Sequence, residues 1–395
     1  MKKQILFIMN NLNCGGAEKA LISLLETIDY SIYEVDLLLF KKEGIFLSKV
    51  PKQVNLLDEP KEFIFFDMPI KKAIKKGFLM GRIDIVINRV GAGFIYKKER
   101  NSARCEQRVW KRIRKTLMPL EKNYDAAIGY LEKNPVYFCI EMVKAKKKIG
   151  FIHNDYEKLG MDSNIDKNYF DKLDHLITVS NECANVLKKN FPLFINKIEV
   201  MQNIVSPAVI KKLSLEEAVK KDSNVHIVSV GRLNYQKGFE FAIHACKTLS
   251  TEGHRLRWDI IGEGEERETL ERLINEAGLK GTINLLGIKE NPYPYIRRAD
   301  IYVQPSRFEG KSIAVDEAKI LQKPIIVTNF STAKDQINDG FNGLIVDMNG
   351  DSIAEGIKKL IENPDIGKKL GLNLSKEKLG TEMEIQKFYR FISAI

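Results

Sequence analysis

Short apolar runs alternate with stretches of helical periodicity along the first half of the chain. Residues 5–9 form an apolar run that ends at Asn10 and is followed by a pair of glycines. Residues 17–27 then repeat apolar side chains at helical spacing, which predicts an amphipathic helix. The same reasoning predicts a helix over 181–189 and further strands over 35–40, 126–130, 148–152, 176–179 and 198–201.

The second half of the chain shows this alternation more clearly. Residues 225–230 are typical of a buried strand, and the turn 231–234 leads into a helix over 238–250. A second pair of a strand and a helix follows over 257–261 and 265–276. Strands that alternate with helices imply a parallel sheet that is covered on both faces. The remaining predicted strands are 283–286, 301–304, 325–328 and 344–346, and helices are expected to begin near Ser312 and Ser352.

The length of 395 residues suits two domains better than one. We expect the boundary near Ser206-Pro207, so that 1–205 and 206–375 form two Rossmann-like domains of the α/β class. Residues 376–395 have no strand partner in the sequence and are expected to form a helix that packs back on the first domain. The apolar stripe of this helix is predicted to be Met383, Ile385, Phe388 and Phe391.

Composition places the chain among globular proteins with apolar cores, since 44% of its residues are hydrophobic. No window reaches the run of about 20 apolar residues that a transmembrane helix needs. The apolar start of the chain is short and lacks a small-residue cleavage site, so we interpret it as a strand and not as a signal peptide. The five cysteines are widely spread and never form a C-x-x-C pair, which favours a reducing cytoplasm and core packing.

The positive charge of the chain is concentrated in one segment. Residues 71–122 hold 16 Lys and Arg but only 4 Asp and Glu, whereas the net charge of the whole chain is +11. The rest of the chain is therefore nearly neutral. Such a segment favours anionic partners, namely acidic lipid, a polyphosphate-linked acceptor or nucleic acid, although it also fits a solvated surface without a partner.

The residues that follow each strand are candidates for ligand binding, because doubly wound sheets bind ligands at the carboxyl ends of their strands. Glu309 and Glu317 lie eight residues apart, one in a loop and one inside the helix after it. Gly310 allows the backbone to approach a ligand. The amides of 312–314 would form a helix N-terminus, which favours a phosphate. The same spacing also fits an ordinary helix cap followed by a solvated glutamate.

Two cations and a pair of glycines follow strands in the same way. Arg232 and Lys237 flank the turn after 225–230, where two fixed cations can neutralise a diphosphate and the charge that grows on a departing one. Gly15 and Gly16 stand between a strand and a helix, where backbone amides can approach an anion. Taken alone, the cations also fit an exposed loop and the glycines an ordinary turn.

His153 follows the predicted strand 148–152, in a segment that could face a cleft between domains. A lone histidine in such a place is more often structural. The segment Gly310-Lys311-Ser312 resembles the end of a P-loop, but Pro305 occupies the position of the required upstream glycine. No cluster has the spacing of a metal site, so no metal is expected.

Taken together, these residues resemble family 4 of the retaining glycosyltransferases. That family has the B-type fold, in which two Rossmann-like domains with parallel sheets face each other across a cleft. The resemblance is strongest over 225–363. The matching positions are Glu309 and Glu317 for the family's E-x7-E pair, Arg232 and Lys237 for its phosphate-binding cations, Gly15, Gly16, Ala17 and Glu18 for its glycine loop, and His153 for its cleft histidine.

The resemblance implies a reaction and a role for each position. The donor is usually a UDP-sugar, and transfer retains the anomeric configuration by front-face attack, without a metal or another cofactor. Residues 1–205 would bind the acceptor and 206–375 the nucleotide-sugar. The implied contacts are Glu309 and His153 with the donor sugar, Glu317 with the ribose, and Arg232, Lys237 and the amides near Ile313 with the diphosphate.

The chain departs from the family after the Glu309-Gly310 pair. Family members often have apolar residues there, whereas this chain has Lys311 and Ser312. A cation beside the donor could bind an acidic sugar or add to the binding of phosphate.

The resemblance also gives the basic segment a meaning. In 108–117, Val109, Ile113 and Leu117 share one helical face among several cations, and such a helix can lie on an anionic membrane. Bacterial members of the family often extend lipid-linked sugars of capsule, O-antigen of lipopolysaccharide, or teichoic polymers. The resemblance therefore implies a cytoplasmic enzyme of cell-surface polysaccharide biosynthesis, peripheral at the inner face of the plasma membrane, with a glycan or lipid-linked acceptor.

Two other classes of function stay open. One is a sugar-nucleotide epimerase or a phosphorylase on the same fold, although a phosphorylase needs a lysine-bound cofactor that the sequence does not announce. The other is a protein that binds acidic lipid or nucleic acid through 71–122. Because aromatic residues of the RNA-recognition type are absent, we expect no nucleic-acid partner.

Overall fold

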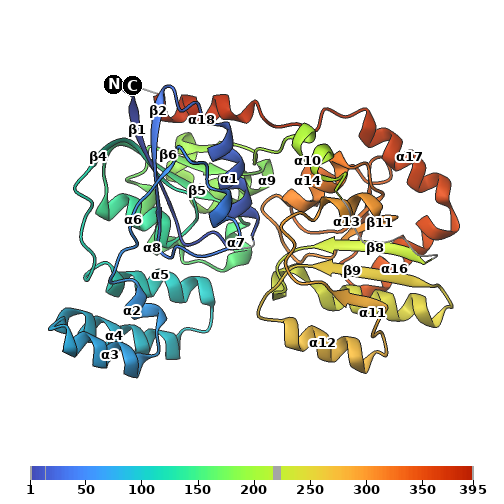
Figure 1. The fold of residues 1–395 in the computed structure, drawn as a ribbon, viewed down its shortest axis with the longest axis horizontal. Helices are drawn as coiled ribbons and strands as arrows, with labels where there is room; N and C mark the ends of the chain where they lie inside the picture. Colours follow the sequence, from blue (N-terminus) through green and yellow to red (C-terminus); the bar gives the residue numbers. More distant parts are fainter. Residues whose placement is uncertain (1, 14, 217–223, 394–395) are drawn as a thin grey trace. The chain divides into compact units, whose positions relative to one another are not determined.

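The computed structural model describes the chain except for residues 1, 14, 217–223 and 394–395. The chain divides into two compact units, each with its own parallel sheet and its own apolar core (Figure 1). Unit 1 comprises Met1–Asn13, Ala17–Gln202 and Glu384–Ile395, and unit 2 comprises Cys14–Gly16 and Asn203–Met383.

Unit 1 is built on a sheet of seven described strands, in the order β3-β2-β1-β4-β5-β6-β7, and every pairing is parallel. The interior strand β1 is buried from Ile5 to Met9, as a strand covered on both faces requires. The strands are β1 (Lys3–Met9), β2 (Tyr33–Leu39), β3 (Asn55–Leu56), β4 (Asn123–Gly129), β5 (Lys144–Ile152), β6 (His175–Thr178) and β7 (Ile198–Val200).

The helices of unit 1 connect these strands and include a group of four between β3 and β4 that the hydrophobic pattern mostly does not reveal. This group, α2 to α5, lies together at one end of the unit (Figure 1). The helices are α1 (Gly16–Thr27), α2 (Ile64–Asp67), α3 (Ile70–Leu79), α4 (Ile83–Lys98), α5 (Ser102–Ile113), α6 (Asn134–Met142), α7 (Tyr156–Leu159), α8 (Ser163–Phe170), α9 (Asn181–Asn190) and α18 (Glu384–Ser393), with short 3-10 turns at Leu47–Lys49 and Pro192–Lys197.

The structure corrects the prediction of a membrane-facing helix over 108–117. Helix α5 ends at Ile113, and the apolar residues Val109, Ile113 and Leu117 are all buried in the core of unit 1 beside Trp110. Their apolar face therefore contacts protein. An amphipathic pattern reports that a face is covered, but it does not say what covers it.

Helix α18 packs on the first unit through aromatic side chains. Phe388 stacks on Phe7 with ring centroids 5.6 Å apart, and Tyr389 stacks on Tyr33 at 5.2 Å. Ile385 and Phe391 are buried as the apolar stripe predicts, whereas Met383 is exposed because it precedes the first turn of the helix.

Unit 2 holds a sheet of six described strands in the order β10-β9-β8-β11-β12-β13, again all parallel. Trp258 and Phe239 lie at the centre of its core. The strands are β8 (Val225–Val230), β9 (Leu256–Ile261), β10 (Ile283–Leu285), β11 (Ile301–Gln304), β12 (Ile325–Thr328) and β13 (Leu344–Val346). The helices are α10 (Pro207–Leu213), α11 (Phe239–Thr251), α12 (Arg267–Glu276), α13 (Tyr293–Arg298), α14 (Ile313–Ile320), α15 (Ala333–Gln336), α16 (Gly350–Glu362) and α17 (Pro364–Ser375), with a 3-10 turn at Tyr235–Lys237.

The described cysteines, Cys105, Cys139, Cys183 and Cys246, are free and buried, in line with core packing. Burial raises the pKa of Cys139 to about 12 and that of Cys246 to about 11, so both stay as unreactive thiols at neutral pH. Within the described part of the chain, no helix combines the length and the apolar character that crossing a membrane requires.

We expect Phe388→Ala to destabilise unit 1 by about 3–5 kcal/mol, because it removes a fully buried ring and leaves a cavity against Phe7. Hydrogen exchange read by mass spectrometry measures the opening free energy of each unit separately. Peptides from β1 and α18 should exchange faster and those from unit 2 should not change. Met383→Ala removes an exposed side chain and is the matched control. Identical exchange in Phe388→Ala and the unsubstituted chain would contradict the docking of α18.

Candidate active site

Two loops of unit 2 are joined at the carboxyl ends of β8 and β11. Gly238 has a positive φ of 61°, and a Cβ atom there would clash with the backbone oxygen of Pro305, so only glycine lets the loops approach this closely. The Arg307 amide donates a hydrogen bond to the Gln236 carbonyl at 2.7 Å, and the Gln236 side chain donates to the Phe308 carbonyl at 3.0 Å. The loop after β8 is thereby fixed against the loop after β11.

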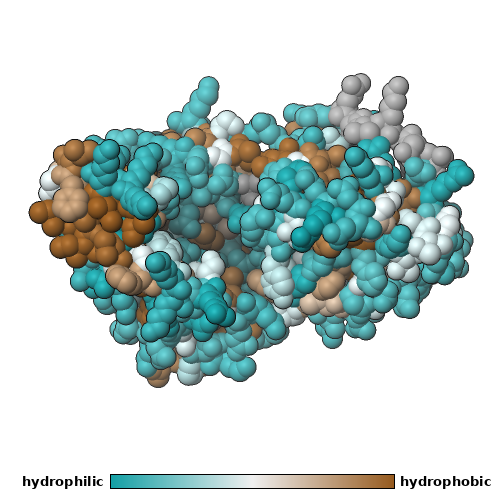
Figure 2. All heavy atoms as spheres, turned by 90° about the horizontal axis from the view of Figure 1, so that it is seen from below, coloured by the Kyte–Doolittle hydropathy of each residue, from teal (hydrophilic) through white to brown (hydrophobic). Residues whose placement is uncertain are grey.

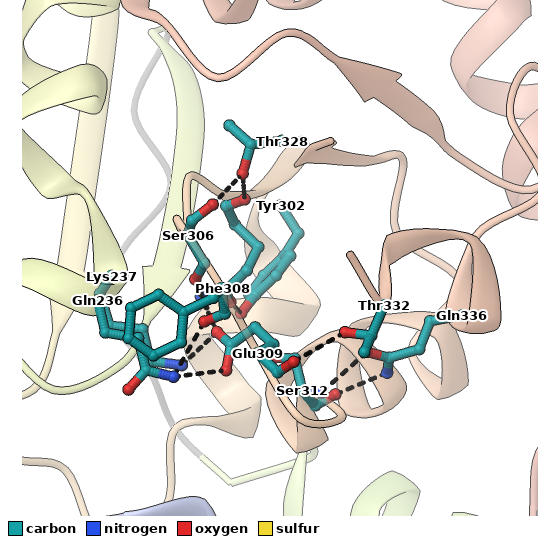
Figure 3. A network of polar contacts seen from close by, with 11 residues as sticks. Gln236, Lys237, Tyr302, Ser306, Phe308, Glu309, Ser312, Thr328, Thr332 and Gln336 are labelled. Carbon is teal, nitrogen blue, oxygen red and sulfur yellow. Dashed lines mark hydrogen bonds and ion pairs between the residues drawn. The ribbon is translucent and has the colours of Figure 1, made fainter. Parts of the chain in front are cut away.

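This junction places Lys237 against Glu309 (Figure 3). Lys237 Nζ lies 2.5 Å from Glu309 Oε1, and the same oxygen accepts hydrogen bonds from Ser306 Oγ at 2.6 Å and Gln304 Nε2 at 3.4 Å. Glu309 is only 5% exposed. Gln236 Nε2 also donates to Glu309 Oε2 at 3.4 Å, so one cation and three further donors hold this buried carboxylate in a single position.

Helix α14 starts directly after this loop and leaves amides available at its N-terminus. Ser312 is the N-cap residue, and its own amide already donates to Gln336 Oε1 at 2.8 Å, which corrects the expectation that this amide is free (Figure 3). Ile313 and Ala314 lie in the first helical turn, where amides have no partner inside the helix. The hydroxyl of Ser312 is buried and unpartnered among the described residues. These groups can bind an anion.

Lys311 lies just before the N-cap of α14, and its side chain points to a partner inside that helix. Its ammonium group forms an ion pair with Asp316, and the side chain is almost fully buried. Asp316 also accepts a hydrogen bond from Gln336 Nε2 at 2.8 Å. The cation that departs from the family pattern is thus neutralised by a neighbouring carboxylate, and Gly310 beside it is buried.

Glu317 lies inside α14, as its place in the sequence pair predicts, and its side chain is buried. The Tyr293 hydroxyl donates a hydrogen bond to Glu317 Oε1 at 3.0 Å. Burial, and then the charges of Glu317 and Glu309, raise the pKa of Tyr302 well above its ordinary value. The charges of both glutamates therefore raise the pKa of one buried tyrosine, although the two residues lie eight positions apart along the chain.

Arg232 follows β8 on the same loop as Lys237 and is exposed. Two glycines let the loop after β9 pack against this one, because a Cβ atom at Gly262 or at Gly264 would collide with the carbonyl of Gly231 or Leu233. The structure therefore groups Arg232, Lys237, Glu309, Gly310, Lys311, Ser312, Ile313 and Glu317 in unit 2, at the carboxyl ends of its strands.

His153 belongs to unit 1 and follows β5. Burial lowers its pKa to about 4, against the opposing influence of the Glu132 charge and of a backbone hydrogen bond at Tyr130. The ring is therefore neutral at pH 7. Its Nε2 atom is buried and has no partner among the described residues, while the His153 amide donates to Glu132 at 3.0 Å.

The glycine pair lies between β1 and α1. A Cβ atom on Gly16 would meet no heavy atom within 4 Å, so packing alone does not require glycine at this position. Cys14 lies outside the described residues. Gly16 thus leaves open space beside the first turn of α1.

Several polar residues of the site escape the sequence patterns. Ser306 and Gln304 could have been found, because they follow or end β11 and post-strand positions are the expected ones. Gln336 and Tyr293 come from other helices, and nothing in their own surroundings signals a contact with α14. Asn234 carries a further buried oxygen without a partner among the described residues.

A cavity lies in each unit. A cavity of about 400 Å³ in unit 1 lies at the carboxyl ends of β1 and β2, and its lining includes Asn10, Phe66, Tyr96 and Asn134. The side-chain oxygens of Asn10 and Asn134 are buried there without partners among the described residues. A cavity of about 670 Å³ in unit 2 lies at the opposite, amino ends of β8 and β11 and includes no candidate residue in its lining.

Comparison with known proteins assigns a family to the chain. The family described as Glycosyl transferases group 1 matches residues 211–377. An enzyme of Campylobacter jejuni, N-acetylgalactosamine-N,N'-diacetylbacillosaminyl-diphospho-undecaprenol 4-alpha-N-acetylgalactosaminyltransferase, is 26% identical over 93% of this chain and 92% of its own length. The lipopolysaccharide core biosynthesis glycosyltransferase LpsE of Rhizobium meliloti is 32% identical, but over only 34% of this chain and 38% of LpsE.

Solved structures show the same fold over the whole chain. HepE of Anabaena, solved in complex with UDP and glucose, aligns with a TM-score of 0.69 at 15% identity and covers 100% of both chains. The two parallel-sheet α/β units share the fold of solved B-type glycosyltransferases, and residues 211–377 match the group 1 glycosyl transferases. Together with the curated relatives, these findings support a family 4 glycosyltransferase.

Proposed function

We propose that this glycosyltransferase moves a sugar from a UDP-sugar to a glycan or lipid-linked acceptor of a bacterial cell-surface polysaccharide, such as capsule or lipopolysaccharide, with retention of anomeric configuration. The polysaccharide context is supported by the names of the C. jejuni and R. meliloti relatives. The choice of UDP is supported by HepE, which was solved with UDP and glucose.

The observation that carries the proposal is the fixed Lys237–Glu309 pair beside the N-terminus of α14. In this proposal the amides of Ile313 and Ala314, together with Arg232 and Lys237, hold the diphosphate and stabilise the charge that develops as it leaves. Glu309 then lies next to the anomeric end of the diphosphate and binds the hydroxyls of the donor sugar. Glu317 binds the ribose.

Unit 1 supplies the groups that meet the acceptor and the outer face of the sugar. Neutral His153 offers Nε2, which suits the acceptance of a hydrogen bond from a sugar hydroxyl. The cavity lined by Asn10 and Asn134 combines polar and aromatic side chains, which is the combination that a sugar ring needs. Gly15 and Gly16 give the donor room to approach the amides of α1.

We propose that the reaction needs neither a metal nor another cofactor, because Lys237, Arg232 and helix amides can supply the positive charge that a divalent ion supplies elsewhere. We also propose that the enzyme works in the cytoplasm, peripheral to the inner face of the plasma membrane, where residues 71–122 meet anionic lipid. A lipid-linked acceptor is held in the bilayer by its lipid, so an enzyme at the membrane surface can reach the sugar that the lipid carries.

Release of UDP from a panel of UDP-sugars, with and without undecaprenyl-diphosphate-linked sugars, tests the activity. UDP release that depends on the acceptor, with an α-linked product from an α-linked donor, is the expected result. Conversion of a UDP-sugar into an isomer without any acceptor would indicate an epimerase and would contradict the proposal.

Glu309→Gln should lower turnover about 10²–10³-fold, because the amide keeps the shape of the side chain but removes the fixed negative charge at the reacting centre. Affinity for UDP, measured by calorimetry, should change less than about threefold, since Glu309 does not bind the nucleotide in this proposal. Glu265→Gln, an exposed glutamate in the loop after β9, is the control and should keep normal turnover. Retention of most of the activity by Glu309→Gln would remove this residue from catalysis.

Lys237→Ala should weaken UDP binding about tenfold, since it removes a cation from the diphosphate site. Lys280→Ala, which changes an exposed lysine elsewhere in unit 2, should leave the affinity as it is. Titration calorimetry with UDP and with uridine separates the contribution of the diphosphate to the affinity from that of the nucleoside, because only UDP carries the diphosphate. An equal loss for UDP and uridine would place Lys237 outside the diphosphate site.

His153 should stay neutral until the pH falls close to its pKa of about 4, whereas the same side chain in the unfolded chain protonates near about 6.5. Its contribution to stability is therefore complete above about pH 6.5 and is lost as the pH falls toward about 4. Nitrogen NMR of the histidine rings between pH 5 and 8 should show no protonation of His153, with exposed His244 as the reference. A midpoint near neutral pH for His153 would contradict its role as a neutral acceptor.

A further inference from the structure

Helices α3 and α4 form a closely packed hairpin that unit 1 holds firmly. A Cβ atom on Gly77 would lie 2.8 Å from Val86 Cγ2, and one on Gly93 would lie 2.9 Å from Ile70 Cδ1, so glycines bring the two helices into contact. Arg89 is buried in the hairpin and donates hydrogen bonds to the carbonyls of Phe65 at 2.9 Å and Met68 at 3.0 Å. The hairpin is therefore an ordered part of the unit.

This ordered hairpin exposes a set of large apolar side chains. Leu79 at its tip is 79% exposed and Phe94 on α4 is 70% exposed. On α4, Ile83, Ile87 and Phe94 repeat at intervals of four and seven residues, which places them on one face of the helix. Figure 2 shows hydrophobic residues gathered in one patch over this end of unit 1. The apolar set consists of Phe78, Leu79, Met80, Ile83, Ile87 and Phe94.

Cations without carboxylate partners lie beside this apolar set. Lys71, Lys72 and Lys75 are exposed on α3, and no ion pair involves them within the described part of the chain. They stand one to two turns before the tip, about 6–12 Å from Leu79 along the helix axis. Lys97 and Lys98 add further exposed charge at the end of α4.

The other cations of the basic segment are mostly engaged within unit 1. Arg104 and Arg108 pair with Glu99, and Arg114 pairs with Glu141. The hairpin therefore carries a large share of the positive charge that is unpaired among the described residues. Further exposed cations beyond it are Arg100, Lys111 and Lys115. An ordinary solvated surface carries charges without a neighbouring apolar patch. The hairpin differs, because its unpaired lysines lie beside exposed apolar side chains.

We propose that the α3–α4 hairpin is a membrane-docking element, whose exposed apolar side chains enter the interfacial layer of an anionic bilayer while the lysines of α3 contact lipid phosphates. The spacing between the lysines and the hairpin tip agrees with this arrangement. Interfacial helices bury an apolar face about 5–10 Å deep, so lysines one or two turns above the tip reach the lipid headgroups. A second copy of the chain is a poorer occupant of this face, since symmetric pairing would bring like charges together.

Co-sedimentation of the full chain with vesicles tests the proposal. The vesicles contain phosphatidylcholine alone or phosphatidylcholine and phosphatidylglycerol in equal parts. The unsubstituted chain should bind the anionic vesicles about tenfold more tightly than the neutral ones, and added salt should reduce this difference. Equal binding to both kinds of vesicle, or binding to neither, would overturn the proposal.

Matched variants locate the contact. Leu79→Ser combined with Phe94→Ser should lower the partition onto anionic vesicles about tenfold. Leu193→Ser changes a leucine that is 73% exposed elsewhere in unit 1 and should bind as the unsubstituted chain does. The assignment would be overturned if the hairpin variant bound anionic vesicles as the unsubstituted chain does. It would also be overturned if Leu193→Ser lowered the partition onto these vesicles as much as the hairpin variant.

The charge of α3 is tested in the same way. Lys72→Glu combined with Lys75→Glu should remove the preference for phosphatidylglycerol, whereas Lys167→Glu combined with Lys172→Glu makes the same change of charge on another exposed surface and should keep most of it. UDP affinity should stay unchanged in every hairpin variant, because the candidate donor site lies in unit 2. If analytical ultracentrifugation without lipid shows a dimer that Leu79→Ser dissociates, the face pairs two copies and the proposal fails.

Discussion

Lys237 and Glu309 form a buried ion pair that joins the loop after β8 to the loop after β11, and the geometry of the candidate donor site depends on it. Opposite charges attract strongly out of water. This attraction offsets the cost of removing the charges from water only when further hydrogen bonds replace the lost hydration. Ser306 and Gln304 supply such bonds to the carboxylate. A charge held in this way needs no rearrangement when a substrate arrives, which is the condition for effective electrostatic stabilisation of a transition state.

The pair can form only because the two loops approach closely. Gly238 accepts a left-handed backbone conformation and has no Cβ atom to strike Pro305, and the N-terminus of α14 begins just beyond Glu309. The result is one cation, one fixed carboxylate and available amides at adjacent positions. These are the groups required to bind a diphosphate and the sugar attached to it.

Unit 1 has a different character. Its candidate groups are neutral: His153 with a pKa of about 4, and the amide oxygens of Asn10 and Asn134 in a partly apolar cavity. Its α3–α4 hairpin instead carries several unpaired lysines beside exposed apolar side chains. Neutral hydrogen-bonding groups suit a sugar, whereas a cationic apolar surface suits an anionic bilayer, so the two proposed functions would use separate parts of one unit.

The sequence by itself determined the alternation of strands and helices, the parallel sheets, and the residues Glu309, Glu317, Arg232 and Lys237 as a set. It could do so because periodicity and position after a strand are local properties of the chain. Only the tertiary structure decided that Lys311 is neutralised by Asp316 and that Gln336 occupies the amide of Ser312. It also decided that the apolar face of α5 is covered by the core while that of α4 is exposed. Which face is covered, and which partner a charge finds, depends on segments distant in sequence, and no local pattern records them.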